Sequence, residues 1–482
     1  MATSWYNTHF EAAGYAGDAD TERTTLELWE SVAAGGRDPA RLAELAVACS
    51  RMPWNAKLTE ALRNHGFDFR LGAFAGGAPA PSCGALFDAL AAVGGGANPM
   101  PFPKPAFLGC ELRHRQAVAT GRGDVTMEHV LVTADGRGFG LVRNLQTCIY
   151  GKVRHGVELE PTGAAAARGG IFGLGSAGGA PWRATEREVA IKCIERAKYE
   201  QHMARHAGRL NEDPIKEVAV MNYVASAGGA RYVLPMLGCY ADEASVYVVM
   251  PFCPHGDLFG VVESRGALEE ARAAAYMGQI VAGLEKLHAL GLAHHDMSLE
   301  NLMLDANEDA IIIDFGMAVK SHPTFTRFLA GPNAPPPPPP GHERDLAAGP
   351  SYYAAPLGPS KGWPCRCGKL LYMAPELFEA KEPFDVFAAD VWALGIILFL
   401  LLTGMPPWDA GSGPTTSDMR YVYVRDGRLD ELLRNWNISL SPHAPDLLQR
   451  LLTADPRSRL TLPQLKAHPW WQANARFVNV PV

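Results

Sequence analysis

The chain has 482 residues, of which 48% are hydrophobic and 20% are charged, and its formal net charge is −7. This balance is typical of a globular protein with a large core, and the negative charge argues against a nucleic-acid partner or an anionic membrane surface. The nine cysteines lack paired spacing and nearby histidines, so we expect a reduced, intracellular, cytoplasmic protein without a zinc site.

The hydropathy of the chain predicts neither a signal peptide nor a membrane span. Its first 20 residues lack a basic start followed by an apolar run. The longest apolar run, Val391–Leu402, is shorter than the about 20 residues that cross a bilayer. We predict that this run forms a buried core helix.

Residues 1–137 form an N-terminal region to which the sequence assigns no role. Residues 21–66 have helical patterning, with Asp38-Pro39 as a helix start. Residues 72–105 are rich in Ala, Gly and Pro, which is typical of a linker. Alternating residues between Glu111 and Asn144 predict strands around an Asp135-Gly136 turn.

From residue 138 onward, short strand-like runs precede longer helical patterns. Strands are predicted within residues 138–145, 188–194, 232–237 and 245–250. A helix follows that ends near Gly291, and its apolar face consists of Met277, Ile280, Leu284 and Leu287. Beyond Pro375 the chain is mostly helical. This order predicts an α+β fold with a small β-rich lobe, a larger helical lobe and a cleft between them.

Two low-complexity inserts interrupt this domain, at about residues 161–184 and 324–364. The first is rich in Gly and Ala, and the second contains the run Pro335–Pro340. Both are predicted to be surface loops. The proline run could bind an SH3- or WW-type partner, although an extended loop is the simpler interpretation. Residues 473–482 are expected to form a C-terminal tail.

Six short motifs in the second part of the chain carry residues suited to phosphoryl transfer. A Lys on a strand can reach nucleotide phosphates, a helical Glu can hold that Lys, and grouped Asp and Asn side chains can bind Mg²⁺. The motifs are Val189–Lys192, Glu217, His294–Asn301, Asp314–Gly316, Met373–Glu376 and Asp390–Trp392.

In their order and spacing these motifs resemble those of eukaryotic protein kinases, over about residues 138–472. The segments VYVVMPFCPHGDLF and DPRSRLTLPQLKAHPWW are similar to the serine/threonine type, and especially to its calcium/calmodulin-dependent-kinase-like branch. The resemblance implies the bilobal kinase fold, preceded here by an additional, partly helical N-terminal region. It also implies ATP and Mg²⁺ as cofactors and proteins as substrates.

The resemblance implies roles for single residues in the transfer step. Asp296 would accept the proton of the substrate hydroxyl, while Lys192 would bind the α- and β-phosphates and Glu217 would orient Lys192. Asn301 and Asp314 would bind Mg²⁺, which prefers oxygen ligands.

Further residues are implied in nucleotide binding and in the core. Next to Met250, the Pro251 carbonyl and the Cys253 N–H would meet the adenine edge. Asp257 would contact the ribose or a basic substrate residue. The residues expected to pack on adenine are Val153, Ala190 and Met303, and those expected in an apolar column are Met221, Met236, His294 and Phe315. Glu376 and Arg459 are expected to form a buried ion pair.

Two segments compete for the glycine-rich turn that covers the phosphates. Gly173–Gly178 matches the GxGxxG pattern, but no strand-like run precedes it and only a short, proline-containing stretch separates it from the lysine strand. We therefore reject it. Leu145–Val153 lies between strand-like runs, with Gln146 and Cys148 in place of two glycines and only Gly151 retained. The missing glycines would limit backbone approach to the phosphates.

The catalytic loop departs from the family pattern. In the catalytic loop, His294–Asn301, serine/threonine kinases carry Arg where His295 stands and Lys where Ser298 stands. In the docking loop, the segment just before Met373, they carry Thr where Lys369 stands. We hypothesise that Lys369 supplies the cation at the γ-phosphate from the opposite wall, with Ser298 as its hydrogen-bond partner. The alternative is that Lys369 points to solvent and Ser298 only lowers activity.

His295 bears on regulation. An imidazole cannot make the bidentate contact by which Arg holds a phosphorylated activation loop. We therefore expect activity that depends little on phosphorylation of that loop, in which Thr324, Thr326 and Ser351 are acceptors.

The predicted function is ATP-dependent transfer of the γ-phosphate to serine and threonine hydroxyls of proteins. Glu300 and Asp257 on the substrate side suggest a preference for basic residues near the acceptor. Two alternatives stay open. One is a pseudokinase that serves as a nucleotide-binding or protein-interaction scaffold, because the glycine-rich turn and the catalytic loop are altered. The other is a dual-specificity or tyrosine-directed kinase, because the catalytic-loop Lys is absent.

Overall fold

A computed structural model describes residues 107–162, 180–205, 214–320, 368–379 and 384–478, and short strands at 67–68, 73–74 and 352–353. The chain divides into two compact units. The barrel unit consists of the described residues within 105–210 and 234–254. The helical unit consists of those within 211–233 and 255–482, with the short strands of the N-terminal region.

Several predicted features lie outside the described residues. They are the helices within 21–66, most of the linker at 72–105, the segment Gly173–Gly178, the proline run and the three activation-loop acceptors.

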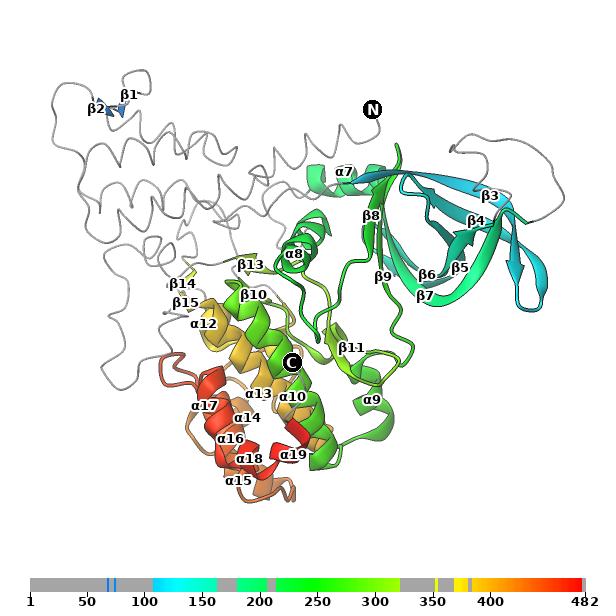
Figure 1. The fold of residues 1–482 in the computed structure, drawn as a ribbon. Coiled ribbons are helices and arrows are strands. Elements are labelled where there is room, and N and C mark those ends of the chain that lie inside the picture. Colours follow the sequence, from blue (N-terminus) through cyan, green and yellow to red (C-terminus); the bar gives the residue numbers. More distant parts are fainter. Residues whose placement is uncertain are drawn as a thin grey trace. The chain divides into compact units, whose positions relative to one another are not determined.

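Seven strands of the barrel unit form a closed barrel (Figure 1). Neighbouring strands follow the order β3-β4-β5-β6-β7-β9-β8, and β3 pairs in parallel with both β8 and the start of β7. The strands are β3 (Leu108–Thr120), β4 (Gly123–Thr133), β5 (Gly138–Cys148), β6 (Gly151–Pro161), β7 (Trp182–Glu195), β8 (Gly238–Ala241) and β9 (Ser245–Pro251), and helix α7 (Arg196–Arg205) follows β7.

The barrel encloses an apolar core because alternate side chains of each strand point inward. Val189 and Ile191 of β7 are fully buried, whereas Ala190 and Lys192 lie on the other face and are half-buried. Two core clusters fill the barrel, one with Leu131, Phe139, Leu141, Val189, Ile191, Tyr240, Tyr247 and Val249, and one with Val118, Val130, Val132, Leu159 and Trp182.

The predicted strands around the Asp135-Gly136 turn are confirmed, because β4 and β5 flank that turn and pair with each other. These strands belong to the same barrel as the rest, so the predicted division between residues 137 and 138 falls inside one structural unit. The strand predicted at 232–237 was wrong: β8 begins only at Gly238. Pro235 within that stretch has no N–H to donate to a sheet.

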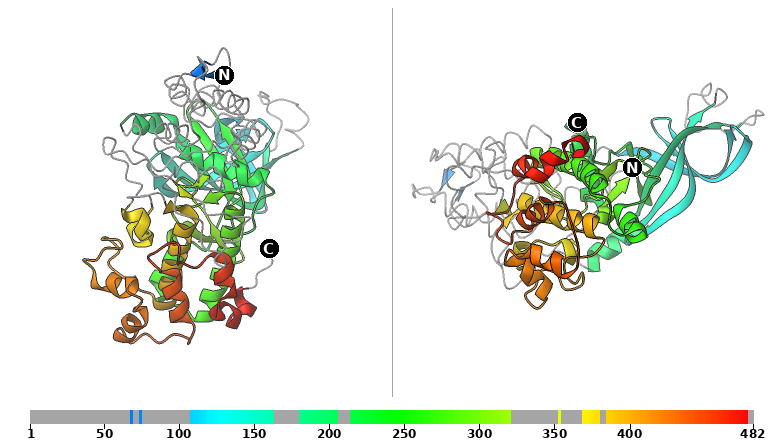
Figure 2. Two further views of the ribbon diagram at one scale, coloured as in Figure 1. Left: turned by 90° about the vertical axis from the view of Figure 1, so that its left-hand side faces the viewer. Right: turned by 90° about the horizontal axis from the view of Figure 1, so that it is seen from below.

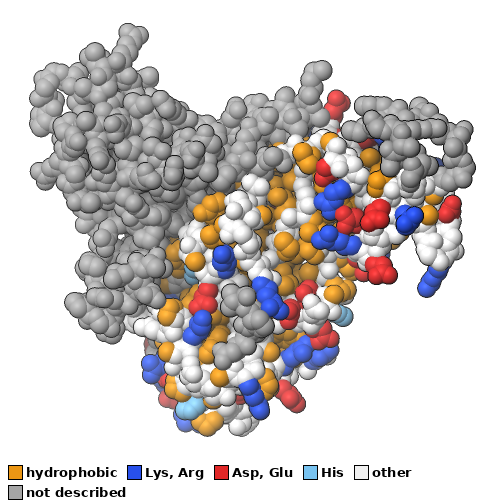
Figure 3. Space-filling model, in the orientation of Figure 1, with side chains coloured by type: hydrophobic (Ala, Val, Ile, Leu, Met, Phe, Trp, Pro, Cys, Tyr) orange, Lys and Arg blue, Asp and Glu red, His pale blue; other side chains and the backbone are white. Residues whose placement is uncertain are grey.

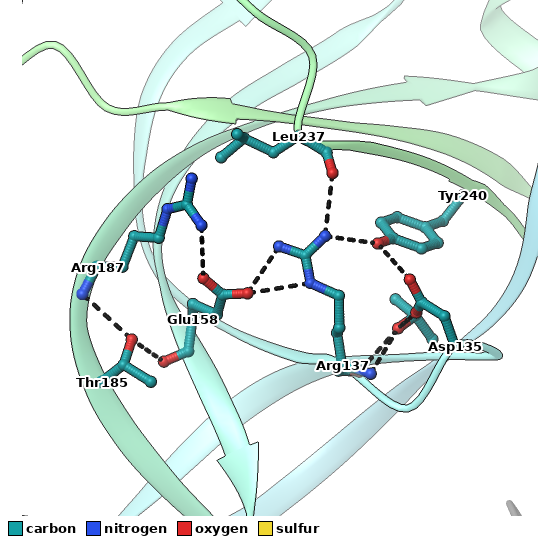
Figure 4. Close-up of polar contacts among 8 residues, drawn as sticks. Asp135, Arg137, Glu158, Thr185, Arg187, Leu237 and Tyr240 are labelled. Carbon is teal, nitrogen blue, oxygen red and sulfur yellow. Dashed lines mark hydrogen bonds and ion pairs between the residues drawn. The ribbon is translucent and has the colours of Figure 1, made fainter.

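A polar network closes one end of the barrel around Arg137, as Figure 4 shows. Its guanidinium binds the Glu158 carboxylate, with an Nη2–Oε1 distance of 2.6 Å, and donates from Nη1 to the Leu237 carbonyl at 3.0 Å. Nη1 also donates to the Tyr240 hydroxyl at 3.3 Å, and that hydroxyl donates to Asp135. Arg137 thereby ties the β4–β5 turn to β6 and to the residue before β8.

The helical unit contains most of the described helices. They are α8 (Pro214–Ser226), α9 (Leu258–Arg265), α10 (Glu270–Ala289), α12 (Pro375–Glu379), α13 (Val386–Thr403), α14 (Met419–Arg425), α15 (Leu429–Asn435), α16 (Ala444–Leu451), α17 (Leu462–Ala467), α18 (Pro469–Ala473) and α19 (Ala475–Val478), with 3₁₀ turns η3 (Leu299–Asn301) and η6 (Leu370–Tyr372).

Short antiparallel strand pairs complete this unit. They are β1 (Phe67–Asp68) with β2 (Ala73–Phe74), β10 (Leu292–Ala293) with β13 (Val319–Lys320), β11 (Leu302–Leu304) with β12 (Ala310–Ile312), and β14 (Tyr352–Tyr353) with β15 (Phe384–Asp385).

Helices α10 and α13 pack together in the core of the helical unit (Figures 1 and 2). The predicted apolar face of α10 is confirmed, because Met277, Ile280, Leu284 and Leu287 are all buried. Helix α13 contains the apolar run predicted to form a core helix. Among the described residues it is the one helix long and apolar enough to cross a bilayer, but 89% of that stretch is buried inside the protein.

The predicted C-terminal tail contains structured residues. Helix α19 packs on α10, where a side chain at Gly278 would meet the Val478 backbone at 2.4 Å. A glycine is therefore required at this helix contact.

On the face shown in Figure 3, acidic and basic side chains are mixed over the described surface.

A buried ion pair fastens α12 to the rest of the helical unit, as predicted. Arg459 is 2% exposed, and its Nη1 and Nη2 atoms bind Glu376 Oε1 and Oε2 at 2.7 and 2.9 Å. The remaining guanidinium hydrogens go to the carbonyls of Thr453, Ala388 and Ala454. Every donor of this guanidinium is thus satisfied, which a buried charge requires.

Replacing Glu376 by Gln should lower the free energy of unfolding by about 3–5 kcal/mol, because the Arg459 charge would stay buried without its counter-charge. Urea unfolding of Glu376→Gln measures this loss. The control is Glu431→Gln, which breaks a surface pair with Arg428 and should change stability far less. Equal effects of the two substitutions would contradict the buried pair's structural role.

Candidate functional site

The catalytic loop of the helical unit is held by one carboxylate from the core. Asp390 of α13 is 2% exposed, and its oxygens accept the backbone N–H groups of His294 and His295 at 2.8 and 2.9 Å. His288 of α10 binds the same carboxylate at 2.9 Å. Burial raises the pKa of Asp390, but the hydrogen bond from His288 and the nearby imidazoles outweigh it, so that the pKa lies below its ordinary value.

The backbone of the loop is strained where Asp390 holds it. His295 has φ of 65°, in the left-handed region that non-glycine residues rarely adopt. The two hydrogen bonds that the backbone N–H groups of His294 and His295 donate to Asp390 fix this conformation. Burial lowers the pKa of His295 to about 4, so the imidazole is neutral at physiological pH. A neutral ring cannot replace the charge of Arg at this position.

Asp296, Asn301 and Asp314 are brought together at the end of this loop. The Asn301 side-chain amide donates to the Asp296 backbone oxygen at 2.7 Å and to Asp296 Oδ2 at 2.9 Å. This leaves the Asn301 side-chain oxygen available as a ligand. The Asn301 carbonyl accepts from the N–H of Ile313, next to Asp314, at 3.0 Å. Asp314 has φ of 63°.

The residue types of this cluster fit Mg²⁺, because they present carboxylate and amide oxygens on neighbouring segments. The predicted metal ligands, Asn301 and Asp314, could hold the ion. Asp314 also raises the pKa of Asp296 through its charge, after the larger effect of burial, whereas Lys369 and His294 lower it. The net direction of the shift is upward.

Lys369 makes the hydrogen bond that the sequence hypothesis required. Its ammonium Nζ donates to Ser298 Oγ at 2.7 Å and lies 3.8 Å from Asp296 Oδ2. Its backbone N–H donates to Asp296 Oδ1 at 3.2 Å. Gly368, with φ of 84°, permits this approach, since a side chain there would meet the His295 carbonyl at 2.9 Å. The role of Lys369 in transfer stays a prediction.

The structure gives Asp257 a local role, and its predicted contact with ribose or substrate stays a prediction. Asp257 caps α9, because its Oδ1 accepts the Gly260 N–H at 2.7 Å, and it forms a backbone bridge with Met303. The rings of His294 and Phe315 are in contact, 5.4 Å between centroids. His294 and Phe315 thus make one contact of the predicted apolar column, and the rest of the column stays a prediction.

The barrel unit places its predicted nucleotide-binding residues on adjacent strands. Val153 of β6 lies opposite Lys192 of β7, and Ala190 lies opposite Met250 of β9. Pro251 ends β9, and Cys253 follows and is buried. Lys192 belongs to the barrel unit and Glu217, which is buried on α8, to the helical unit. Their pairing stays a prediction.

The turn between β5 and β6 is a tight hairpin in which Cys148 pairs with Gly151. Tyr150 is 3% exposed, its ring contacts those of Tyr199 and His202 on α7, and its carbonyl accepts the Glu195 N–H. A side chain at Gly151 would meet the Cys193 carbonyl at 2.0 Å. Packing against β7 therefore requires the retained glycine, whatever its role toward phosphates.

The topology also bears on the rejected segment Gly173–Gly178. This segment lies in the connection that leaves β6 at Pro161 and enters β7 at Trp182. Lys192 is ten residues further along β7, about 33 Å at the usual rise of a strand. Gly151 pairs with Ile194, close to the lysine. The β5–β6 hairpin is thus the turn at the lysine end of the sheet.

Sequence reasoning missed two residues near these sites. Tyr372 lies three positions after Lys369 in η6, and its hydroxyl contacts the catalytic loop. His155 lies opposite Ala190, and its ring contacts Phe252 with 4.4 Å between centroids. The sequence carried a signal for each residue. Tyr372 follows Lys369 at the i, i+3 spacing that places two residues on one side of a 3₁₀ turn, and His155 follows Val153 at the i, i+2 spacing that places two residues on one face of a strand.

In the described part of the chain no group of three or more His, Cys, Asp or Glu side chains is placed to hold a metal ion by itself. The two-residue arrangement of Asn301 and Asp314 needs further oxygen ligands, as Mg²⁺ sites with nucleotides usually do.

Comparison with known proteins places these residues in a family. Residues 170–337 and 351–471, more than half of the chain, match the family described as protein kinase domain. The match begins in the connection between β6 and β7, so that β5 and β6 lie before it.

Two relatives illustrate the similarity. Calcium-dependent protein kinase 1 of Oryza sativa is 30% identical over 274 residues, which are 56% of this chain and 44% of the relative. A Saccharomyces cerevisiae protein named fatty acyl-CoA synthetase and RNA processing-associated kinase 1 is 26% identical over 297 residues, 61% of this chain and 29% of the relative. The match thus spans less than half of either relative.

Asp390→Asn should remove a contribution to the free energy of unfolding that depends on pH. Because the pKa of Asp390 in the folded protein lies below its ordinary value, the stability that this carboxylate contributes is complete above the unfolded pKa and is lost as the pH falls through the folded pKa. At neutral pH the variant should lose about 2–4 kcal/mol of unfolding free energy, and this gap should narrow below about pH 4.

Urea unfolding between pH 7 and pH 3 measures the gap between wild type and Asp390→Asn. The control is Asp430→Asn, whose carboxylate is 60% exposed and whose curve should run parallel to that of the wild type. A gap for Asp390→Asn that stays constant with pH would contradict the assigned charge of Asp390.

Proposed function

The chain belongs to the protein kinase family, and we propose that it is an active, ATP- and Mg²⁺-dependent kinase that phosphorylates serine and threonine residues of proteins. The observation that carries this proposal is the cluster of Asp296, Asn301 and Asp314 with the ammonium of Lys369 beside it. Phosphoryl transfer depends mainly on positioning and on neutralising charge, and these four side chains supply both.

Asp296 is the proposed proton acceptor. Its Oδ1 accepts the Lys369 N–H, and its Oδ2 accepts from the Asn301 amide. The carboxylate is therefore oriented by two donors and has lone pairs left for a substrate hydroxyl. Mg²⁺, when bound by Asn301 and Asp314, would offset the charge of the triphosphate.

Lys369 takes the place of the missing catalytic-loop lysine in this proposal. The hydroxyl of Ser298 and the ammonium of Lys369 have exchanged segments relative to the family pattern, yet the two groups meet at 2.7 Å. The positive charge beside Asp296 is therefore retained, although it comes from the docking loop. This favours a kinase over a pseudokinase scaffold, which needs no such cation.

The barrel unit is proposed to bind the nucleotide through Lys192, Val153, Ala190 and the backbone around Met250. The altered glycine-rich turn is consistent with weak nucleotide binding, because Tyr150 is packed on α7 and Gln146 and Cys148 carry side chains. A pseudokinase that binds nucleotide without transfer is the second candidate, and this turn is the observation that favours it.

Independence from activation-loop phosphorylation follows from His295. Its imidazole is buried and neutral at physiological pH, and it holds no charge with which to bind a phosphorylated side chain. Activity should therefore be equal before and after phosphatase treatment. Loss of activity on treatment would contradict this regulation.

Transfer of radiolabelled γ-phosphate to a mixed Ser, Thr and Tyr peptide library tests the proposed function directly. We expect labelling of Ser and Thr peptides, its abolition by Asp296→Ala, and a loss of about 10²-fold with Lys369→Ala. The double variant Ser298→Lys/Lys369→Thr restores the usual arrangement and should recover transfer. Nucleotide binding without transfer would establish the pseudokinase, and labelling of Tyr peptides a dual specificity.

A further inference from the structure

The Lys369 ammonium has three polar neighbours on the catalytic loop, and one of them, Glu300, has no role yet in the transfer step. Besides Ser298 and Asp296, the ammonium lies 4.0 Å from Glu300 Oε1. Glu300 is the residue before the proposed metal ligand Asn301, on the short turn η3. The ammonium thus lies near two carboxylates, one on the proton acceptor and one on Glu300.

Glu300 is held in turn by a buried tyrosine. The Tyr372 hydroxyl accepts the Leu299 N–H at 3.3 Å and donates to Glu300 Oε2 at 3.3 Å. Because the hydroxyl has one hydrogen and accepts from Leu299, that hydrogen is directed to the carboxylate. Burial, and then the charge of Glu300, raise the pKa of Tyr372, so that it stays a donor at physiological pH.

Tyr372 and Lys369 belong to the same short segment. The Tyr372 N–H donates to the Lys369 carbonyl at 3.0 Å across the turn η6. The docking loop therefore presents an ammonium and a hydroxyl together, and Glu300 meets both, one with each carboxylate oxygen. This arrangement places the Glu300 carboxylate within 4.0 Å of the lysine charge.

We propose that Glu300, oriented by Tyr372, is a positioning residue that holds the Lys369 ammonium beside Asp296. The proposal rests on the proposed function, in which that ammonium acts at the γ-phosphate. A lysine side chain has four rotatable bonds and loses much freedom when fixed. A second carboxylate that attracts it, added to the Ser298 hydrogen bond, reduces the positions that it occupies.

The proposal changes the expectation for substrates. Glu300 on the substrate side suggested a preference for basic residues, but a carboxylate engaged by Lys369 is less available to a basic substrate side chain. The two roles predict different kinetics. Loss of a substrate contact raises the KM for the peptide, whereas a displaced Lys369 lowers kcat with little change in KM.

The test compares Glu300→Gln, Lys369→Ala and the double variant in steady-state peptide phosphorylation. We expect Glu300→Gln to lower kcat about tenfold with an unchanged peptide KM. In the Lys369→Ala background the same substitution should have no further effect, because there is no ammonium left to position. Tyr372→Phe should lower kcat in the same direction and less.

The matched control is Glu285→Gln. Glu285 pairs with Lys466 and is 34% exposed, the same fraction as Glu300, but it lies on α10 away from the loop, and its substitution should leave kcat unchanged. Additive effects in the double variant, or a raised peptide KM with normal kcat, would overturn the positioning role of Glu300.

A second measurement does not depend on catalysis. The rate at which an amine-acetylating reagent modifies Lys369, followed by mass spectrometry, should rise in Glu300→Gln, because the ammonium loses a partner that protects it. The modification of Lys466 should stay the same in that variant. If the wild type transferred no phosphate, the proposed function would fail, but an unchanged rate at Lys369 would separately overturn this inference.

Discussion

The candidate site depends on the carboxylate of Asp390. It lies on α13, a helix whose residues are nearly all buried, and it accepts two consecutive backbone N–H groups of the catalytic loop. Those bonds help to offset the cost of the left-handed backbone at His295. Because Asp296 is the next residue, the placement of the proposed proton acceptor follows from a helix in the core.

The docking loop is joined to the same frame from the other side. Glu376 and Arg459 form a fully satisfied buried pair at α12, and the segment just before α12 carries Lys369 and Tyr372. The cation beside Asp296 therefore stands on a segment that is anchored at its end. This anchoring explains how a lysine of the docking loop can place its ammonium beside the Asp296 carboxylate, where the family pattern has a lysine of the catalytic loop.

In the barrel unit, closure of the sheet pairs the strand edges that an open sheet would leave unpaired. The hairpin of β3 and β4 covers the edges of β5 and β8, and the Arg137 network joins their ends. A closed barrel has no long unpaired edges. At the lysine end of the sheet, Tyr150 packs on α7 and only glycine fits at position 151.

The sequence by itself determined the residue types of the candidate site and the buried faces of α10 and α13, because motif order and periodicity are local or nearly local patterns. The ion pair of Glu376 and Arg459, 83 positions apart, was expected only from the resemblance to protein kinases. It also raised the exchange between Ser298 and Lys369. Only the tertiary structure decided that these two side chains meet, that β3 and β4 close the barrel, and that Tyr372 orients Glu300. Such contacts join residues some 70 positions apart in the chain, and no spacing rule within one element fixes a distance of that kind.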